Sequence, residues 1–412
     1  MPLLFFRKWF LLLVATACVF LGCRKNVGTS RPVRPAPSVT ASAGPALTED
    51  EYRDFGKRLE AAINACDEGA SARLYRFEEL AERCISDLSV PVDLREAYVS
   101  GFKKAGTSLL AARVIEDVKK GGTFTFIRVR LVDGRPRVLM RAVVPDEGLN
   151  YQELTLVRFP DGQIGVEDVF ALTTGEMLSH TLRRMILKVV SESEPRLLGG
   201  FTAPERRYAT HLLQIHSMQT AVREGRPHEA FAIYRKLPTE LQQDKHVQLE
   251  GIRAARGIND DEYVQVLEEF RQHHPSDAVV DLISMDYFLL KLQYDQCLEC
   301  IERLDKAVGG DPYLTHLRGI VFLESARYAA ARAEFENAIK QEPTLEDAYW
   351  SRITVSLKEQ NHADTLAWLQ RIVEKMNVAI EEQNIRAAQD YADFIKSRQF
   401  GEFIEWYQSR EK

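Results

Sequence analysis

The chain has 412 residues, 45% of them hydrophobic and 28% charged, which is the composition of an ordinary globular protein. Its length allows two or three domains, each with a core of its own. The formal net charge is −6, and residues 200–412 carry 26 basic against 35 acidic side chains. Because an acidic chain lacks the basic surface that neutralises phosphates, we expect no nucleic acid among its partners.

The N-terminal segment has the pattern of an export signal. Arg7 and Lys8 precede an apolar run at 9–22, which is shorter than the roughly 20 residues that a membrane-spanning helix needs. We therefore predict a signal peptide over residues 1–22, with an uncleaved membrane anchor as the alternative. Residues 23–46 are rich in proline, serine and alanine and lack acidic side chains, which predicts a flexible tether.

The apolar run ends in the letters FLGC at 20–23, which resemble a bacterial lipobox. In a lipobox, a small residue precedes a cysteine that becomes the lipidated mature N-terminus; Cys18 is a weaker alternative site. The resemblance implies that a lipid on Cys23 anchors the protein in a membrane of the bacterial cell envelope. Arg24 stands where many inner-membrane lipoproteins carry Asp, so the resemblance favours the outer membrane, facing the periplasm.

The next segment, 47–199, changes from a helical to a strand pattern. Apolar spacing predicts three helices, the first with a capping box at Thr48 and the third broken by Gly101 and Gly106. Four strands follow, at 123–132, 135–144, 151–159 and 163–173. Asp-Gly pairs supply two of the turns between them. A last helix at 176–190 completes an α+β domain with a four-stranded antiparallel sheet.

This order of elements resembles the nuclear transport factor 2-like superfamily over residues 48–193. The resemblance implies that the helices and the concave face of the sheet enclose a pocket. That pocket is a catalytic site in some members of the superfamily and a binding site in others. No catalytic signature of a member family is present in the sequence, so we predict no catalytic residues.

Polar side chains on the predicted strands form the candidate pocket of this domain. Alternation places Phe124, Phe126, Arg128 and Arg130 on one face of the first strand. The pocket candidates are Arg128, Arg141, Tyr151, Glu153 and Asp168. If the faces of the strands coincide, arginines and carboxylates converge on a patch that binds an anion or transfers protons. The interpretation that we favour is instead a solvated outer face of the sheet, or a rim that pairs with another domain.

Four further cysteines follow Cys23. Cys66 and Cys84 lie in neighbouring predicted helices, and an exported location would permit a disulfide between them. Cys297 and Cys300 lie in the middle of a predicted helix, where buried thiols are a better interpretation than a redox motif or a zinc site. We predict no metal and no cofactor.

From residue 211 to residue 379 the chain repeats itself every 33 or 34 residues. The clearest copy, 312–343, has the residue spacing of a tetratricopeptide repeat, a pair of antiparallel helices. The copies align on the packing pairs Ala230/Tyr234, Tyr263/Leu267, Cys297/Ile301, Ala331/Phe335 and Thr365/Leu369. Gly251 and Gly319 mark tight contacts between helices. Because one repeat buries little surface alone, we predict an all-α solenoid over 200–412, capped by a helical pair at 381–408.

Resemblance to tetratricopeptide proteins implies a groove, lined by the first helices of the repeats, that binds other proteins. By register, the groove residues are Lys245, Gln248, Arg256, Asp286, Tyr313, His316, Trp350 and Lys358. Tyr313 and Trp350 would be exposed aromatic anchors, although Trp350 packs between neighbouring repeats in the alternative interpretation. The Lys/Asn/Arg arrangement of the chaperone-binding members is absent, which argues against a receptor for chaperone tails.

These features together predict a non-enzymatic scaffold of the bacterial cell envelope, anchored to a membrane by lipid, that binds other proteins through its repeats. Two alternatives remain open. In the first, the α+β domain binds or turns over a small ligand, and the solenoid positions it. In the second, the chain is a lipoprotein of the outer-membrane assembly machinery, some components of which carry such repeats.

Overall fold

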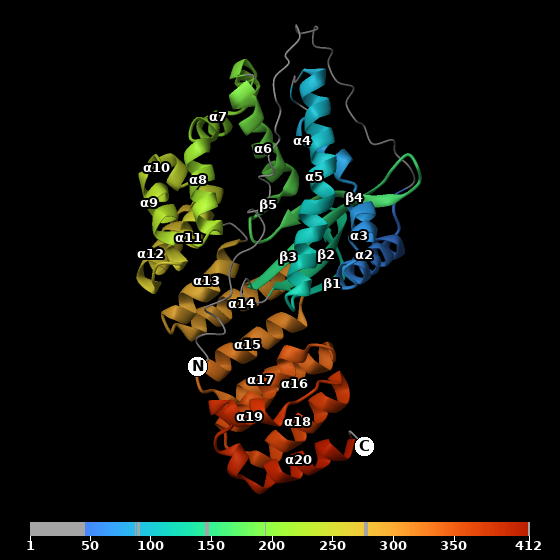
Figure 1. Cartoon of the computed structure of the whole chain (residues 1–412), viewed down its shortest axis with the longest axis vertical. Helices are drawn as coiled ribbons and strands as arrows, with labels where there is room; N and C mark the ends of the chain where they lie inside the picture. The colour runs from blue at the N-terminus through green and yellow to red at the C-terminus, as the bar shows by residue number, and fades with distance from the viewer. Residues whose placement is uncertain are drawn as a thin grey trace. The chain divides into compact units, whose positions relative to one another are not determined.

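The computed structural model describes residues 46–86, 88, 91–144, 148–193, 195–275 and 279–410 (Figure 1). The predicted signal peptide, the lipidation site Cys23 and nearly all of the predicted tether lie outside these residues. The chain forms two compact units, one up to Tyr287 and one from Phe288 onward. Among the described helices, none has both the length and the apolar character needed to cross a membrane.

Helices precede the sheet of the first unit, as the apolar spacing predicts. Their bounds are α2 Glu49–Asn64, α3 Glu68–Tyr75, α4 Phe77–Cys84 and α5 Val92–Lys119, and α6 Leu178–Ser193 follows the sheet. The capping box at Thr48 is present, with Glu51 as its partner. The second predicted helix is divided into α3 and α4 by Arg76, which has a left-handed backbone (φ 46°). The predicted break in the third helix is wrong, because α5 continues through Gly101 and Gly106.

The sheet has the antiparallel order β1-β2-β3-β4-β5. Its strands are β1 Thr123–Val132, β2 Arg135–Val144, β3 Gly148–Arg158, β4 Ile164–Ala171 and β5 Glu176–Met177. The four predicted strands are present, and Asp133 and Gly134 take the positive φ values (51° and 74°) that a tight hairpin turn requires. The fifth strand was not expected: its two residues, placed in the last predicted helix, pair with Phe170 and Ala171 of β4.

One face of the sheet packs against α2, α3, α5 and α6. Side chains of that face join those of the helices in a single hydrophobic core, which includes Phe55, Ile115, Met140 and Leu154, all fully buried. Helices before and after the sheet thus cover the same face. The likeness to the nuclear transport factor 2-like superfamily remains a prediction.

A β-bulge in β1 corrects the predicted faces of that strand. Phe124 and Phe126 lie opposite Ala142 and Met140 of β2, and they face the helices. The register shifts between Phe126 and Arg128, so that Arg128 lies opposite Leu139. One extra residue in a strand reverses the alternation of the side chains beyond it. The phenylalanines and the arginines of β1 therefore lie on opposite faces of the sheet.

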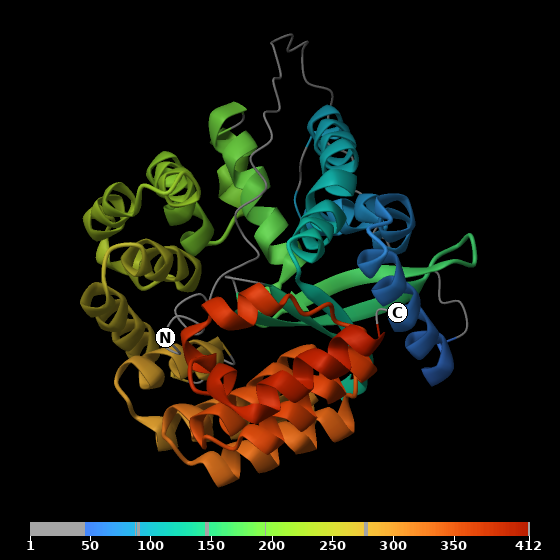
Figure 2. The same cartoon turned by 60° about the horizontal axis from the view of Figure 1, so that its bottom comes forward.

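Helical pairs follow at the predicted period (Figure 2). After the 3₁₀ turn η1 Pro195–Gly200 and α7 Ala203–Thr210, the pairs are α8 Leu212–Arg223 with α9 Pro227–Lys236, α11 Lys245–Arg256 with α12 Asp260–His273, α13 Val279–Leu290 with α14 Tyr294–Val308, α15 Pro312–Glu324 with α16 Tyr328–Gln341, and α17 Glu346–Lys358 with α18 His362–Met376. A single turn, α10 Thr239–Gln242, stands between the first two pairs. The boundary between the two compact units falls within α13.

The positions that define the repeat are the buried contacts of these helices. All ten residues of the five packing pairs are at most 4% exposed. Gly251 and Gly319 stand against aromatic rings: a Cβ atom added to them would lie 2.7 Å from Tyr234 and 2.4 Å from Phe335. The predicted all-α solenoid of tetratricopeptide type is confirmed as the architecture that follows the α+β domain.

The end of the chain is a modified helical pair. Its second helix, α20 Arg398–Arg410, is present as predicted. The first is divided into α19 Glu382–Ala387 and the 3₁₀ turns η2 Gln389–Tyr391 and η3 Phe394–Lys396, because Ala388 has an extended backbone. Phe394, Phe400 and Phe403 are buried beneath this segment. Polar residues cover much of the outer side of α20, as is typical of the capping end of a solenoid.

Candidate functional site

Four of the predicted groove residues are buried inside the helical pairs. Gln248, Asp286, Tyr313 and His316 are at most 7% exposed. The ring of His316 lies 5.5 Å from that of Tyr313, and its Nε2 is 3.0 Å from Oγ of Ser351 on the next first helix. The prediction that Tyr313 is an exposed aromatic anchor is therefore wrong. These positions pack against neighbouring helices, as in the contacts of Gln248 with His273 and of His316 with Phe335, and do not line an open groove.

The other four groove candidates retain some exposure. Arg256 is half-buried in α11. Trp350 is also half-buried, and its Nε1 donates to Oε1 of Glu346 at 2.9 Å. Lys358 forms an ion pair with Asp390 of η2, at 3.0 Å. Trp350 is thus the one predicted aromatic anchor with a surface that a partner can reach.

Asp286 and Tyr263 form a buried polar pair between α12 and α13. The Tyr263 hydroxyl donates to Oδ2 of Asp286 at 2.9 Å. Burial raises the pKa of Asp286 to about 6, although Arg256 and the Tyr263 hydroxyl act in the opposite direction. A carboxylate in this position is costly for the fold when it is ionised.

The Asp286 pair predicts a pH dependence of stability. Because the folded pKa of about 6 lies above the ordinary value of 3.8, the favourable contribution of Asp286 is present below pH 4 and is lost as pH rises through 6. We expect Asp286→Asn to gain stability relative to the wild type by roughly 3 kcal/mol between pH 4 and pH 7. Urea unfolding at four pH values measures this difference.

Asp261→Asn is the matched control, since Asp261 is exposed in the first turn of α12. Its unfolding free energy should follow that of the wild type at every pH. If the curves of Asp286→Asn and the wild type run parallel from pH 4 to pH 7, Asp286 does not titrate as described.

Four of the five pocket candidates share one face of the sheet, and Asp168 does not join them. Arg141 and Tyr151 lie opposite each other in the β2–β3 ladder and are each 1% exposed. Glu153 pairs with Arg137 at 2.9 Å and with Arg130 at 3.6 Å.

Asp168 instead lies at the start of α6. Its carboxylate accepts hydrogen bonds from Oγ and N of Ser179, at 2.6 and 3.1 Å. Arg128 lies on β1 beyond the bulge, opposite Leu139. Since Leu139 lies opposite Glu153 and two residues from Arg141, the register places Arg128, Arg141, Tyr151 and Glu153 on one face of the sheet, and only Asp168 departs from the predicted patch.

Two small cavities lie between the helices and the sheet, and none of the five candidates lines them. Val114 of α5 and Gln152 of β3 contribute to both. Their volumes are about 30 and 20 Å³. Spaces of this size hold one or two water molecules, whereas ligand pockets are typically several hundred Å³. These cavities give no support to a small-ligand site in the domain.

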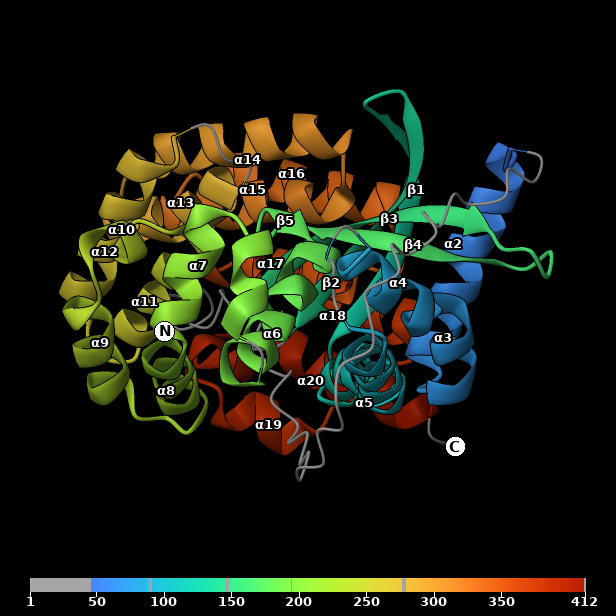
Figure 3. The same ribbon diagram turned by 90° about the horizontal axis from the view of Figure 1, so that it is seen from above.

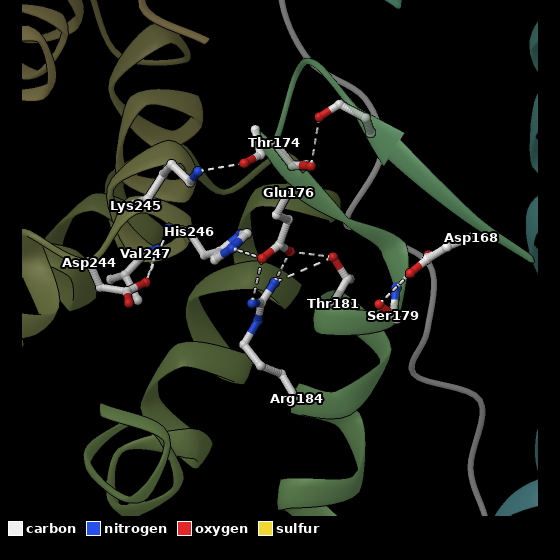
Figure 4. A network of polar contacts seen from close by, with 12 residues as sticks. Asp168, Thr174, Glu176, Ser179, Thr181, Arg184, Asp244, Lys245, His246 and Val247 are labelled. Atoms are coloured by element: carbon white, nitrogen blue, oxygen red, sulfur yellow. Dashed lines mark hydrogen bonds and ion pairs between the residues drawn. The ribbon is translucent and has the colours of Figure 1, made fainter. Parts of the chain in front are cut away.

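A polar cluster joins the sheet to the first repeats (Figure 4). Glu176 of β5 accepts hydrogen bonds from Arg184 and Thr181 of α6, and its Oε2 lies 2.5 Å from Nε2 of His246 in α11. Next to it, Nζ of Lys245 donates to the carbonyl oxygen of Gly175 at 2.8 Å. The groove candidate Lys245 thus contributes to a contact within the first unit.

The cluster keeps Glu176 ionised. Burial acts to raise the pKa of Glu176, but the hydrogen bonds from His246 and Arg184 outweigh it and hold the pKa well below its usual range. A general base works best with a pKa near the working pH, so this carboxylate is poorly suited to proton transfer. The carboxylate instead connects β5 to α6 and α11, because three side chains from these two helices meet on it.

The cysteines in the described part of the chain are thiols and form no disulfide. Cys66 and Cys84 are not joined in a disulfide. Burial raises the pKa of the Cys84 thiol to about 12, which leaves it protonated near neutral pH. Cys297 and Cys300 are buried thiols in the middle of α14, as expected. Among the residues that the structure describes, no group of three or more His, Cys, Asp or Glu side chains is placed to hold a metal ion.

The architecture defines the chain as an α+β domain followed by tetratricopeptide-like helical repeats. No protein-family model and no curated protein matches the chain. Among solved structures, it is similar to MamA 41-end from Desulfovibrio magneticus RS-1, at 16% identity, with a TM-score of 0.35 over 40% of this chain and 94% of that one. The MamA RS-1 ArsTM double mutant gives the same identity and TM-score over 93% of its length.

Proposed function

We propose that this protein is a non-enzymatic scaffold that holds other proteins through its helical repeats. The observation that carries the proposal is the stack of helical pairs, whose ten defining positions are all buried at a constant period. In such repeats the regularly spaced packing residues are buried between the helices. The outer and groove surfaces remain available to partners. Half-buried Trp350, on the first helix of the pair α17/α18, has the amphipathic character of an interface anchor.

The location is a second part of the proposal and rests on the sequence. A lipid on Cys23, followed by the tether at 24–46, would hold the repeats beside a membrane of the bacterial cell envelope, with the outer membrane favoured. Mass spectrometry of the mature N-terminal peptide tests it: we expect acyl chains on Cys23 and a soluble protein for Cys23→Ser. An unmodified Cys23, or a membrane-bound Cys23→Ser variant, would remove the lipid anchor.

Replacing Trp350 with alanine is expected to weaken partner capture at least tenfold, because a half-exposed tryptophan supplies a large apolar contact area. The measurement is quantitative affinity capture with the full chain from envelope extracts. Trp406→Ala is the matched control, since Trp406 is likewise half-buried but lies on the capping helix α20. Equal capture by both variants and the wild type would exclude the surface around Trp350 as the site that binds partners.

The two alternative functions have no specific support among the described residues. A ligand-binding or enzymatic α+β domain requires a pocket, and the cavities beside Val114 and Gln152 hold only water-sized volumes. A place in the outer-membrane assembly machinery rests on the repeats and the lipid signal alone. The repeat scaffold is therefore the function we propose.

A further inference from the structure

Strand β1 is one edge of the sheet, and the outward backbone groups of its two halves differ in their hydrogen bonding. In the first half, the side-chain amide of Asn64 takes the place of a neighbouring strand. Its Nδ2 donates to the Phe124 carbonyl at 2.8 Å, and its Oδ1 accepts from the Phe124 N–H at 3.3 Å. Helix α2 packs beside this half, with the Phe126 ring against Gly56. Open backbone groups on an edge strand invite pairing, and here they are satisfied.

Beyond the bulge the edge is open. The hairpin closes on the pair Val132 and Arg135, and the next pair joins Leu131 to Pro136. Proline has no N–H, so Leu131 and Pro136 form a non-hydrogen-bonded pair, and the N–H and C=O of Leu131 point away from β2. By alternation the same holds for Val129. Among the described residues, neither Leu131 nor Val129 has another hydrogen-bond partner for these outward groups.

The open half of the edge is accessible. Ladder pairing between β2 and β3 begins only at Val138, although β3 continues to Arg158, so the end of the β1–β2 hairpin is not paired with β3 and points away from it, as Figure 3 shows. The Leu131 side chain is 73% exposed, and Arg135 is exposed too. An extended segment of another chain could therefore add as a sixth strand, with main-chain hydrogen bonds to Val129 and Leu131.

The charge at this end of the hairpin selects the occupant. Arg128, Arg130, Arg135 and Arg137 all lie near the open edge, where Glu153 pairs with Arg130 and Arg137, and Asp133 pairs with Arg137, while Arg135 at the exposed end of the hairpin adds a further positive charge. A second copy pairing through the same edge would set Arg130 opposite Arg130, which is unfavourable. The chain's own segment 24–46 carries four basic and no acidic side chains, so it is repelled as well. An acidic segment is the complementary partner.

We propose that the outer edge of β1, from Arg128 to Val132, binds an extended acidic peptide segment of a partner protein by strand addition. The main chain of Val129 and Leu131 supplies the hydrogen bonds, and the surrounding arginines supply the preference for glutamate or aspartate at alternate positions. This surface belongs to the α+β domain and not to the helical repeats, so the proposal stands whether or not the repeats bind partners.

The experiment uses the full chain and a fluorescein-labelled hexapeptide of alternating glutamate and valine, with a lysine–valine hexapeptide as the comparison. Leu131→Pro removes one outward donor and leaves the β1–β2 ladder intact, whereas Leu131→Ala keeps that donor. We expect fluorescence anisotropy to show binding of the acidic peptide only. Affinity should fall at least tenfold further for Leu131→Pro than for Leu131→Ala, and at least fivefold for Arg135→Glu. Hydrogen exchange of the Leu131 amide should slow on binding.

Other outcomes would overturn the proposal. Equal binding of the lysine peptide would remove the charge preference, and equal affinity of Leu131→Pro and Leu131→Ala would remove strand addition. A dimer that Leu131→Pro converts to a monomer would show a second copy on the edge. Slow exchange of the Leu131 amide without peptide would show that the edge is already occupied. Arg135→Glu keeps the test valid if the proline variant fails to fold.

Discussion

Replacing Glu176 with glutamine is expected to lower the free energy of unfolding by roughly 3–5 kcal/mol, because it removes the carboxylate of a largely buried cluster and leaves the Arg184 guanidinium without its ionic partner. Arg184 and His246 would lose their shared carboxylate, with side chains that are only 18% and 12% exposed. Since these side chains come from α6 and α11, the variant should also loosen the first repeats from the sheet. Urea unfolding followed by circular dichroism measures the loss.

The matched control is Glu49→Gln, which breaks the exposed ion pair between Glu49 and Arg53 in α2. Exposed pairs of this kind contribute at most about 1 kcal/mol, so the control should unfold close to the wild type. In the wild type, the contribution of Glu176 should be fully present above its ordinary pKa of 4.5 and should be lost progressively as pH falls from there towards the lowered pKa. A Glu176→Gln variant as stable as Glu49→Gln would show that the cluster does not hold the first repeats to the sheet.

Replacing Gly319 with alanine is expected to destabilise the second unit by about 2 kcal/mol or more, even though alanine favours the helix. The added Cβ would lie 2.4 Å from Cε1 of Phe335, which is fully buried and has little freedom to move. Thermal unfolding of the variant measures the effect. Combining it with Phe335→Leu should cost less than the sum of the two single changes, because the smaller side chain relieves the clash.

Gly401→Ala is the control for this experiment, since Gly401 lies in helix α20 and a Cβ there meets no atom within 4 Å. This variant should gain about 0.5–1 kcal/mol from the better helix former. If Gly319→Ala also gains stability, the close contact between the helices of the repeat is not as tight as the structure shows.

The sequence predicts the repeats and the hairpin well, because both have strong local signals. The 33- or 34-residue spacing identifies the buried positions of each helical pair, down to Gly319 against Phe335. The pair Asp133-Gly134 gives the bounds of β1 and β2 correctly, since few residues other than Asn, Asp and Gly accept positive φ values. The break at Arg76 has no such signal, because an arginine in a left-handed conformation is not recognisable from its neighbours.

The site was harder to predict for a different reason. The groove register gives the direction of a side chain on its helix but not the depth of the helix in the stack, so Tyr313 and His316 were expected at the surface. The bulge after Phe126 is an insertion of one residue without a glycine or proline to mark it, and it moves the arginines to the other face. The Glu176 cluster joins residues far apart in sequence through a strand of only two residues, which no periodicity reveals.

The central claim, that the repeats hold other proteins, is tested most directly by site-specific photo-cross-linking in cells that make the full chain. A photoreactive amino acid replaces Trp350 on α17, and in a parallel strain it replaces Glu405, which is exposed on α20. We expect discrete protein adducts from position 350 and few from position 405. Adducts from neither position, or the same adducts from both, would contradict the claim.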